Sequence, residues 1–371
     1  MIRLLVVDDS PLMRRLMGVV FEAAGDFEVE FARDGQEALE RLNTFAPHVV
    51  TLDVEMPRMN GLDCLDQIML KRPTPVVMVS ALTTHGAETT LDALDLGAVA
   101  FVPKPARANS LAVEAIAAEL VETVRAAAGA KLRSTHRLKE RVRARAGLAP
   151  HPVKRRATRT EPPPAPVKAP KPAAPVFGDV AGLVLVGAST GGPPALDALL
   201  GALPADFPWP VLVAQHMPSS FTGPLARRLD GLCALNVREV KGPIPLAAGQ
   251  IYIAAGDADM VVAKRPAGLV AQPVPSHAEH RWHPSVNRLV ESALEHFPAE
   301  RLAAVLMTGM GDDGAREMTR LRERGGRTIA EAMETAVVWG MPGALVDLGG
   351  AEFTTPLPQI GKRLISLVAA S

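Results

Sequence analysis

A short apolar run followed by a tight, glycine-rich turn constrains this chain more than any other feature. The run Leu183–Val186 predicts a buried strand, and the turn Gly187–Gly192 leads into a predicted helix after Pro193. This order places Ser189 at the carboxyl end of a strand, beside a helix amino terminus. The turn also fits the G-x-S-x-G pattern of an exposed nucleophilic serine, in which the flanking glycines allow the tight backbone.

This turn has two other possible interpretations, a phosphate-binding loop and a plain strand-to-helix turn. Ser189 occupies the second glycine position of a G-x-G-x-x-G pattern, and Pro193 stands where a P-loop has lysine. Both phosphate-binding patterns therefore fail. The plain turn stays open beside the nucleophile, because short motifs also occur by chance.

Length, cysteine content and apolar runs limit the class of protein. The chain has 371 residues, enough for two or three domains with full cores. Its two cysteines, Cys64 and Cys233, lie far apart and fit neither a disulfide framework nor a metal site, which favours a reducing, cytoplasmic compartment. The first residues do not resemble a signal peptide, and no apolar run approaches the ~20 residues of a membrane helix, so we expect no membrane insertion.

Charge and proline content divide the chain into three segments. Residues 1–130 carry 11 Lys/Arg against 19 Asp/Glu, whereas residues 131–160 carry 11 against 1. Nine prolines follow between Pro150 and Pro175, so this stretch is expected to be extended and mobile. We predict a domain over 1–128, a basic and then proline-rich linker over 129–178, and a second domain over 179–371.

Short apolar runs alternate with amphipathic stretches in the first 128 residues. This alternation predicts an α/β domain with a five-stranded parallel sheet and helices on both faces. A long helix is predicted over 110–145. The expected strands are Arg3–Val7, Glu28–Ala32, Val49–Leu52, Val76–Val79 and Ala98–Val102.

Polar residues follow these strands at the edge where parallel sheets gather their chemistry: Asp8, Asp9, Asp53, Ser80 and Lys104. Three carboxylates at one edge repel each other unless a cation is present, and oxygen ligands suit Mg²⁺. A carboxylate nucleophile, a metal, a lysine and a hydroxyl donor make a site for a phosphoryl group. A solvated acidic edge with one salt bridge is the simpler alternative, and five polar residues that follow four different strands argue against it.

These residues resemble a two-component receiver domain, and the resemblance covers about residues 1–128. It implies that a histidine kinase phosphorylates Asp53. The motifs that carry it are V-D-D-S at 7–10, D-V-E-M-P-R-M-N-G at 53–61, S-A at 80–81 and F-V-P-K-P at 101–105.

The resemblance also assigns roles to the neighbouring residues. It implies that Asp8 or Asp9 and the Glu55 carbonyl help Asp53 to hold Mg²⁺. It also implies that Ser80 and Lys104 bind the phosphoryl group and that Phe101 is the switch aromatic. Asn60 stands where the closest relatives usually have Asp, and little effect is expected in a turn.

Alternation resumes after Ala181 and predicts a doubly wound α/β domain. A hairpin is expected to interrupt it, formed by two of the predicted strands with Gly256 and the turn Pro266-Ala267-Gly268 between them. The expected strands are Leu183–Val186, Val211–Ala214, Gln250–Ala254, Leu269–Gln272, Ala303–Met307 and Thr328–Ala330.

Two further strand ends join Ser189. His216 follows the strand at 211–214, and Asp313 follows the strand at 303–307 in a glycine-rich turn. Each residue alone would be an ordinary loop residue. Together, a serine, a base and an orienting carboxylate at three strand ends could form a triad in one crevice. The chain order Ser–His–Asp differs from that of α/β-hydrolases, chymotrypsin and subtilisin.

The second domain resembles the catalytic domain of the chemotaxis protein-glutamate methylesterases over about residues 180–368. The resemblance implies a triad of Ser189, His216 and Asp313, with Thr190 and Met310 lining the site near the oxyanion. The motifs are G-A-S-T-G-G at 187–192, Q-H-M-P at 215–218, P-S-V at 284–286, T-G-M-G-D-D-G at 308–314 and W-G-M-P at 339–342. His283 and Asn287 depart from the family's usual Arg and Asp on either side of P-S-V.

The combined prediction is a response-regulator esterase that hydrolyses glutamate γ-methyl esters on chemoreceptors and deamidates selected glutamines, with no cofactor for the esterase reaction. The expected partners are methyl-accepting receptors and a histidine kinase.

A DNA-binding response regulator is the rival function, because the segment 131–159 is basic. However, no aromatic residues interleave with that charge, and the sequence shows no compact helix-turn-helix. A non-catalytic receptor-binding module is the third alternative, and ester turnover would exclude it.

Overall fold

The computed structural model describes residues 1–80, 83–104, 110–130, 132, 180–266 and 268–369. Residues 133–179, which contain most of the predicted linker, lie outside the described residues. Contacts divide the chain into two compact units. In the described ranges, no helix combines the length and the apolar content that a bilayer-spanning segment needs.

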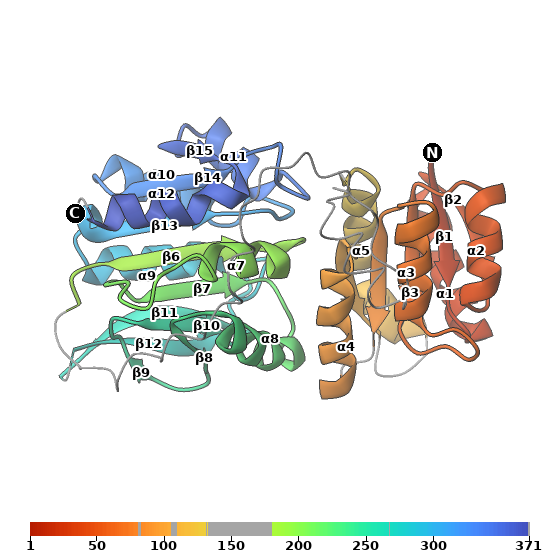
Figure 1. Ribbon diagram of the computed structural model, residues 1–371, viewed down its shortest axis with the longest axis horizontal. Helices are drawn as coiled ribbons and strands as arrows, with labels where there is room; N and C mark the ends of the chain where they lie inside the picture. Colours follow the sequence, from red (N-terminus) through yellow and green to blue (C-terminus); the bar gives the residue numbers. More distant parts are fainter. Residues whose placement is uncertain (81–82, 105–109, 131, 133–179, 267, 370–371) are drawn as a thin grey trace, which may run out of the picture. The chain divides into compact units, whose positions relative to one another are not determined.

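The amino-terminal unit contains a five-stranded parallel sheet in the order β2-β1-β3-β4-β5, as predicted (Figure 1). Helix α1 packs against α5, and α2 packs against α3. The elements of this region are β1 (Ile2–Val7), α1 (Pro11–Ala24), β2 (Phe27–Ala32), α2 (Gly35–Thr44), β3 (Val49–Asp53), α3 (Gly61–Lys71), β4 (Val76–Ser80), α4 (Thr84–Asp95), β5 (Ala100–Pro103) and α5 (Ser110–Ala128).

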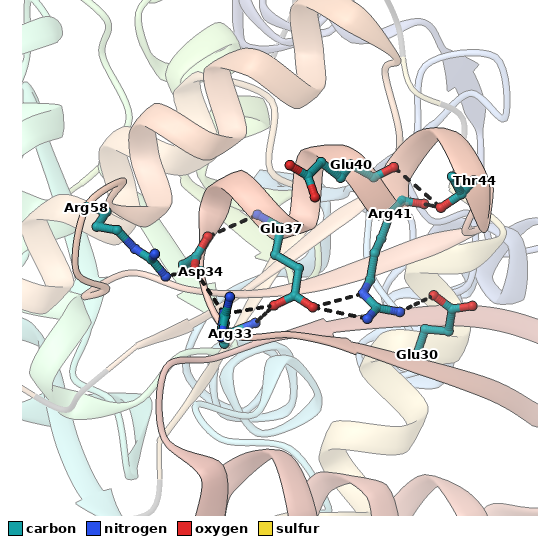
Figure 2. Close-up of polar contacts among 8 residues, drawn as sticks. All are labelled: Glu30, Arg33, Asp34, Glu37, Glu40, Arg41, Thr44 and Arg58. Carbon is teal, nitrogen blue, oxygen red and sulfur yellow. Dashed lines mark hydrogen bonds and ion pairs between the residues drawn. The ribbon is translucent and has the colours of Figure 1, made fainter.

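Two polar contacts fix the start of α2. The Asp34 carboxylate caps the helix by accepting from the N–H groups of Gln36 and Glu37. Arg58, in the connection between β3 and α3, pairs with the same carboxylate (Figure 2). Arg58 adopts a left-handed φ of 67°, so this ion pair holds a strained residue of the loop that follows Asp53.

The predicted helix over 110–145 is wrong in its length. Helix α5 ends at Ala128, and the Gly129 N–H turns back to the Ala126 carbonyl at 3.2 Å. Glycine commonly follows a helix in this way because it tolerates the conformations that end one. The rest of the predicted range, from residue 133 to 145, lies outside the described residues.

The carboxyl-terminal unit contains a seven-stranded sheet in the order β15-β14-β13-β6-β7-β10-β8, in which every pair is parallel (Figure 1). Its strands are β6 (Leu183–Ala188), β7 (Val211–Gln215), β8 (Asn236–Val240), β10 (Gln250–Ala254), β13 (Leu302–Leu306), β14 (Arg327–Glu331) and β15 (Phe353–Thr355). Strand β7 follows β6 in the chain and lies on one side of it, whereas β13 comes later and lies on the other side. The strand order therefore reverses between β6 and β13, and open α/β sheets bind ligands at such a topological switch point.

Two groups of helices accompany this sheet. Helix α7 contacts α8 and α12, whereas α10 contacts α9 and α11. Apolar residues of the strands, of α9 and of α10 form one buried cluster that includes Leu185, Leu212, Leu289 and Met318. The helices are α7 (Gly192–Leu200), α8 (Ser219–Leu232), α9 (Val286–His296), the short 3-10 turn η1 (Ala299–Arg301), α10 (Ala315–Glu323), α11 (Met341–Asp347) and α12 (Leu357–Ala369).

The inserted hairpin is present, but one of its strands differs from the prediction. The expected partner Gln250–Ala254 is β10 of the main sheet, and the strand that pairs with β12 (Gly268–Pro275) is β11 (Ala258–Arg265). The hairpin joins β9 (Ile244–Pro245) in a separate antiparallel sheet. Strand β11 was missed because Asp259 interrupts its apolar pattern, although that side chain is buried.

Candidate active site and phosphoryl-acceptor site

Three neighbouring strand ends bring the predicted triad residues to one place. Ser189 follows β6, His216 follows β7, and the turn bearing Asp313 lies between β13 and α10. Backbone hydrogen bonds tie these ends together, because the Ser189 N–H donates to the Thr308 carbonyl and the His216 N–H donates to the Ala188 carbonyl, both at 3.0 Å. The convergence predicted from the sequence is therefore present.

His216 and Asp313 form a buried pair. The His216 Nε2 lies 2.8 Å from the Asp313 Oδ2, and the two side chains are 6% and 5% exposed. Because a carboxylate can only accept a hydrogen bond, Nε2 carries the proton. In the neutral ring the other nitrogen, Nδ1, is then unprotonated; it is buried and has no hydrogen-bond partner within the described residues.

The amino terminus of α9 keeps Asp313 ionised. Its Oδ2 accepts from the Val286 N–H at 2.7 Å, and its Oδ1 accepts from the Asn287 N–H at 3.0 Å and the Ser285 hydroxyl at 3.2 Å. Burial raises the pKa of this carboxyl, but the hydrogen bond and charge of His216 and these backbone donors outweigh burial and lower the pKa below its usual value. Asp313 is therefore a fixed anion behind the imidazole.

Ser189 is half-buried and makes no side-chain hydrogen bond to His216 in the part of the chain that the structure describes. Such contacts are often long in ligand-free enzymes and tighten when substrate binds. Gly309 presses closely on the serine, since a Cβ at Gly309 would lie 2.7 Å from the Ser189 Cβ. Only glycine fits at this position without displacing the serine.

The turns after β6 and β13 are joined beside Ser189. The Thr308 hydroxyl donates to the Thr190 carbonyl at 2.9 Å and accepts from the Val338 N–H at 3.0 Å. Gly191 has a left-handed φ of 77°, which turns the chain directly after Thr190. The backbone N–H groups of Thr190 and Met310 make no hydrogen bond to any described residue, so both remain able to donate to a ligand.

Gln215 is a further site residue that the sequence did not predict, although it begins the Q-H-M-P motif at 215–218. It is 2% exposed, and its Nε2 donates to the Ser189 carbonyl at 2.9 Å and to the His216 carbonyl at 3.1 Å. One amide therefore links the backbone of the serine to that of the histidine. A glutamine that ends an otherwise apolar strand was the signal available.

The two departures from the family pattern lie behind Asp313. The His283 Nδ1 lies 2.9 Å from the Asp259 Oδ1, an oxygen that also accepts from the Ser285 N–H at 2.6 Å. The Arg288 guanidinium forms an ion pair with the Asp259 Oδ2 at 2.7 Å. Asn287 contacts Asp313 through its backbone N–H, a contact that does not depend on its side chain.

In the amino-terminal unit, the predicted acidic residues meet at the strand ends as expected. One carboxylate oxygen from each of Asp8, Asp9 and Asp53 lies within 4.8 Å of the other two. The Lys104 Nζ lies 2.6 Å from the Asp53 Oδ2 and 3.1 Å from the Asp8 Oδ2. Asp9 is exposed, whereas Asp8 and Asp53 are buried.

The other receiver residues surround this cluster. Ser80 ends β4 and is fully buried, and its carbonyl accepts from the Lys104 N–H at 2.7 Å. Phe101 lies half-buried in β5, and the Glu55 N–H donates to the Asp53 Oδ1 at 3.2 Å. Asn60 caps α3 by accepting from the Asp63 N–H at 2.9 Å, as an aspartate could, which supports the small effect expected for this departure.

Burial works against the charge on Asp53. Burial raises the pKa of Asp53 to about 6. Lys104 lowers this pKa and partly offsets the effect of burial, whereas the nearby charge of Asp8 raises it further. Burial alone would lower the pKa of Lys104, but the charges of Asp53 and Asp8 raise it above its usual value. The buried acidic pair is therefore only partly neutralised by its lysine.

Replacing Asp53 with asparagine is expected to stabilise the metal-free protein near neutral pH by about 1–3 kcal/mol. The folded-state pKa of about 6 exceeds the usual 3.8, so this group destabilises the fold progressively as pH rises between those values. Urea unfolding with a chelator measures the gain, which should shrink toward about pH 4, where both states begin to protonate. A loss of stability near neutral pH would show that pairing with Lys104 outweighs burial.

Comparison with known proteins agrees with both halves of this arrangement. Residues 4–116 match the response regulator receiver domain family, and residues 184–364 match the CheB methylesterase family. A "protein-glutamate methylesterase/protein-glutamine glutaminase 2" of Rhodopseudomonas palustris is 54% identical over 98% of both chains. A "protein-glutamate methylesterase/protein-glutamine glutaminase 3" of Rhodospirillum rubrum is 49% identical over 98% of this chain and 95% of that one.

Among solved structures, the CheB methylesterase catalytic domain of Thermotoga maritima is 36% identical, covers 51% of this chain and 99% of that domain, and has a TM-score of 0.49. The relatives above align along nearly the whole chain, receiver and catalytic parts included. The chain therefore belongs to the protein-glutamate methylesterase/protein-glutamine glutaminase family, with a receiver domain preceding its CheB methylesterase domain.

Proposed function

We propose that this protein hydrolyses glutamate γ-methyl esters on chemoreceptors, deamidates specific receptor glutamines, and is activated by phosphorylation of Asp53. The buried pair between the His216 Nε2 and Asp313, beside Ser189 at the next strand end, supports the esterase most directly. Relatives named for both activities support the choice of substrate. Two buried cysteines that form no disulfide agree with a cytoplasmic location.

In the proposed mechanism, the Ser189 hydroxyl attacks the ester carbonyl while the His216 Nδ1 accepts its proton. Asp313 stabilises the imidazolium through Nε2–H. The Ser189 Oγ–carbon bond forms, the carbon–methoxy bond breaks, and methanol leaves with the proton that His216 returns. Water then attacks the acyl-enzyme with His216 as base, releasing glutamate and restoring Ser189.

The free N–H groups of Thr190 and Met310 would stabilise the oxyanion that forms during each attack. They stand on the two turns that the Thr308 hydroxyl helps to join. Donors fixed by the fold stabilise a developing charge without having to reorganise. The esterase reaction needs no cofactor in this scheme.

The receiver site fits Mg²⁺, because three carboxylates converge within 4.8 Å and one lysine only partly neutralises them. Asp8, Asp9, Asp53 and the Glu55 carbonyl would hold the ion, which would neutralise charge on the incoming phosphoryl group. Asp53 would accept that group from a histidine kinase. Lys104 and Ser80 would bind the oxygens of the phosphoryl group. Phe101, the switch aromatic, would change its position on phosphorylation.

Two rival functions make different predictions. A DNA-binding regulator would show a salt-sensitive mobility shift with duplex DNA, whereas the proposed esterase binds no nucleic acid. A non-catalytic receptor-binding module would bind methylated receptor without releasing methanol. Methanol release therefore separates the proposed function from both.

Adding a small phosphodonor and Mg²⁺ to the full chain is expected to raise methanol release from methylated receptors by roughly 5- to 150-fold, the usual range of coupling between two sites. The Asp53→Asn variant should keep its basal rate and lose the increase. An increase that survives in this variant would contradict Asp53 as the acceptor. Absence of release from wild-type protein in every condition would contradict the esterase itself.

A further inference from the structure

We propose that Trp282 is a positioning residue for His216, a role that rests on the proposed use of His216 as the base. The two rings stack with centroids 5.6 Å apart and an interplanar angle of 9°. This is an offset-stacked arrangement within the favourable range for ring pairs. Trp282 lies in the segment between β12 of the hairpin and α9, the helix whose first N–H groups donate to Asp313.

A single hydrogen bond does not fix the plane of an imidazole. The contact between Nε2 and Asp313 places one nitrogen, but the ring can still turn about that direction. Such a turn would move Nδ1, the nitrogen that must reach the Ser189 hydroxyl. Stacking on a flat neighbour opposes this turn, so Trp282 supplies the constraint that Asp313 cannot.

Trp282 is itself held on several sides. A Cβ at Gly311 would lie 3.1 Å from the Trp282 Nε1, so the indole packs against this backbone, which has a left-handed φ of 83°. The Arg281 guanidinium lies over the indole at 4.8 Å from the ring centroid. Directly after it, His283 is fixed by buried Asp259. A ring anchored in this way can act as a template for the imidazole.

The stack also suits the charge that develops on His216. When Nδ1 accepts the serine proton, the ring becomes a cation beside the electron-rich indole, an interaction that favours the charged form. His216 is only 6% exposed, so an indole that packs on it also limits access of water that would compete for Nδ1. Geometry and charge therefore both predict an effect on the chemical step.

The test compares Trp282→Leu with Trp282→Phe in the full chain, using methanol release from methylated receptors. Leucine lacks a flat aromatic face, and we expect kcat to fall roughly 10- to 100-fold with KM within about twofold, as small displacements of catalytic groups do. Phenylalanine keeps the face and should retain kcat within about threefold. His277→Ala is the control, because His277 lies in the same segment, is exposed and contacts Glu279 rather than either ring of the stack.

Two readouts separate positioning from a structural or substrate-binding role. Ring protons of His216 should show an upfield ring-current shift in NMR spectra of wild-type and Trp282→Phe protein and lose it in Trp282→Leu. In a His216→Ala background, Trp282→Leu should have no further effect on the residual rate. A rise in KM with unchanged kcat, or an equal loss in both backgrounds, would overturn the proposal.

Failure of this inference is distinguishable from failure of the proposed function. If His216→Ala abolishes hydrolysis while Trp282→Leu keeps full kcat, His216 remains the base and Trp282 is not its positioning residue. If His216→Ala retains near-normal hydrolysis, the proposed mechanism is wrong, and the inference falls with it.

Discussion

Replacing Ser189 with alanine is expected to lower the rate of methanol release by roughly 10⁵- to 10⁶-fold, as loss of the nucleophile does in other triad enzymes. The change removes the nucleophile but leaves the buried pair of His216 and Asp313 and the free Thr190 N–H in place. The residual rate would reflect the oxyanion donors alone. Initial rates with methylated receptors measure the loss.

The structural cost of this change should be small. Ser189 is half-buried, its side chain makes no hydrogen bond within the described residues, and its backbone bond to Thr308 does not depend on the side chain. Thermal unfolding should therefore match that of the wild type. Ser219→Ala, an exposed serine just past His216, is the control and should keep its rate. Near-normal release by folded Ser189→Ala protein would refute the nucleophile.

Asp313→Asn is expected to lower the rate of hydrolysis by about 10⁴-fold, the loss seen when a triad aspartate becomes an amide. Asp313 accepts four hydrogen bonds through its two oxygens, and an amide can accept with only one of them. If its NH₂ replaces Oδ2, it faces both the Val286 N–H and the His216 Nε2–H. The histidine then favours the other tautomer, with its proton on Nδ1, and cannot accept one from Ser189.

The adjacent Asp312→Asn variant is a close control, because Asp312 is exposed and precedes Asp313 in the same turn. It should remain within about twofold of the wild type, as exposed substitutions usually do. Nitrogen NMR of the His216 ring should show Nε2–H in wild-type protein and a shift toward Nδ1–H in Asp313→Asn. An unchanged tautomer together with an unchanged rate would contradict the proposed role of Asp313.

The strand ends could be predicted from the sequence because the strands of a parallel sheet are apolar runs, and β6 and β7 are fully buried. Once these runs are placed in each part, the general rule for parallel sheets predicts that the polar residues after them lie at one edge. Ser189, His216 and Asp53 are clear from the sequence because each directly follows or ends its strand.

Other features depend on contacts between residues far apart in sequence. Strand β11 contains Asp259, which contacts His283 and pairs with Arg288, and no local pattern reveals such partners. The same limit applies to the nitrogen that His216 presents to Asp313, because these two residues lie 97 positions apart in the sequence. The stacking of Trp282 on His216 likewise joins residues on separate elements.

The central place of β6 also orders the appearance of activity during protein synthesis. Ser189 and His216 leave the ribosome early and can pair their strands at once, because β6 and β7 are neighbours in the sheet. Strand β13 must then be translated and dock on the open side of β6 before Asp313 can reach the histidine. A nascent chain that ends before Asp313 carries the serine and the imidazole without their carboxylate. We therefore expect no efficient ester hydrolysis until most of the domain has been synthesised.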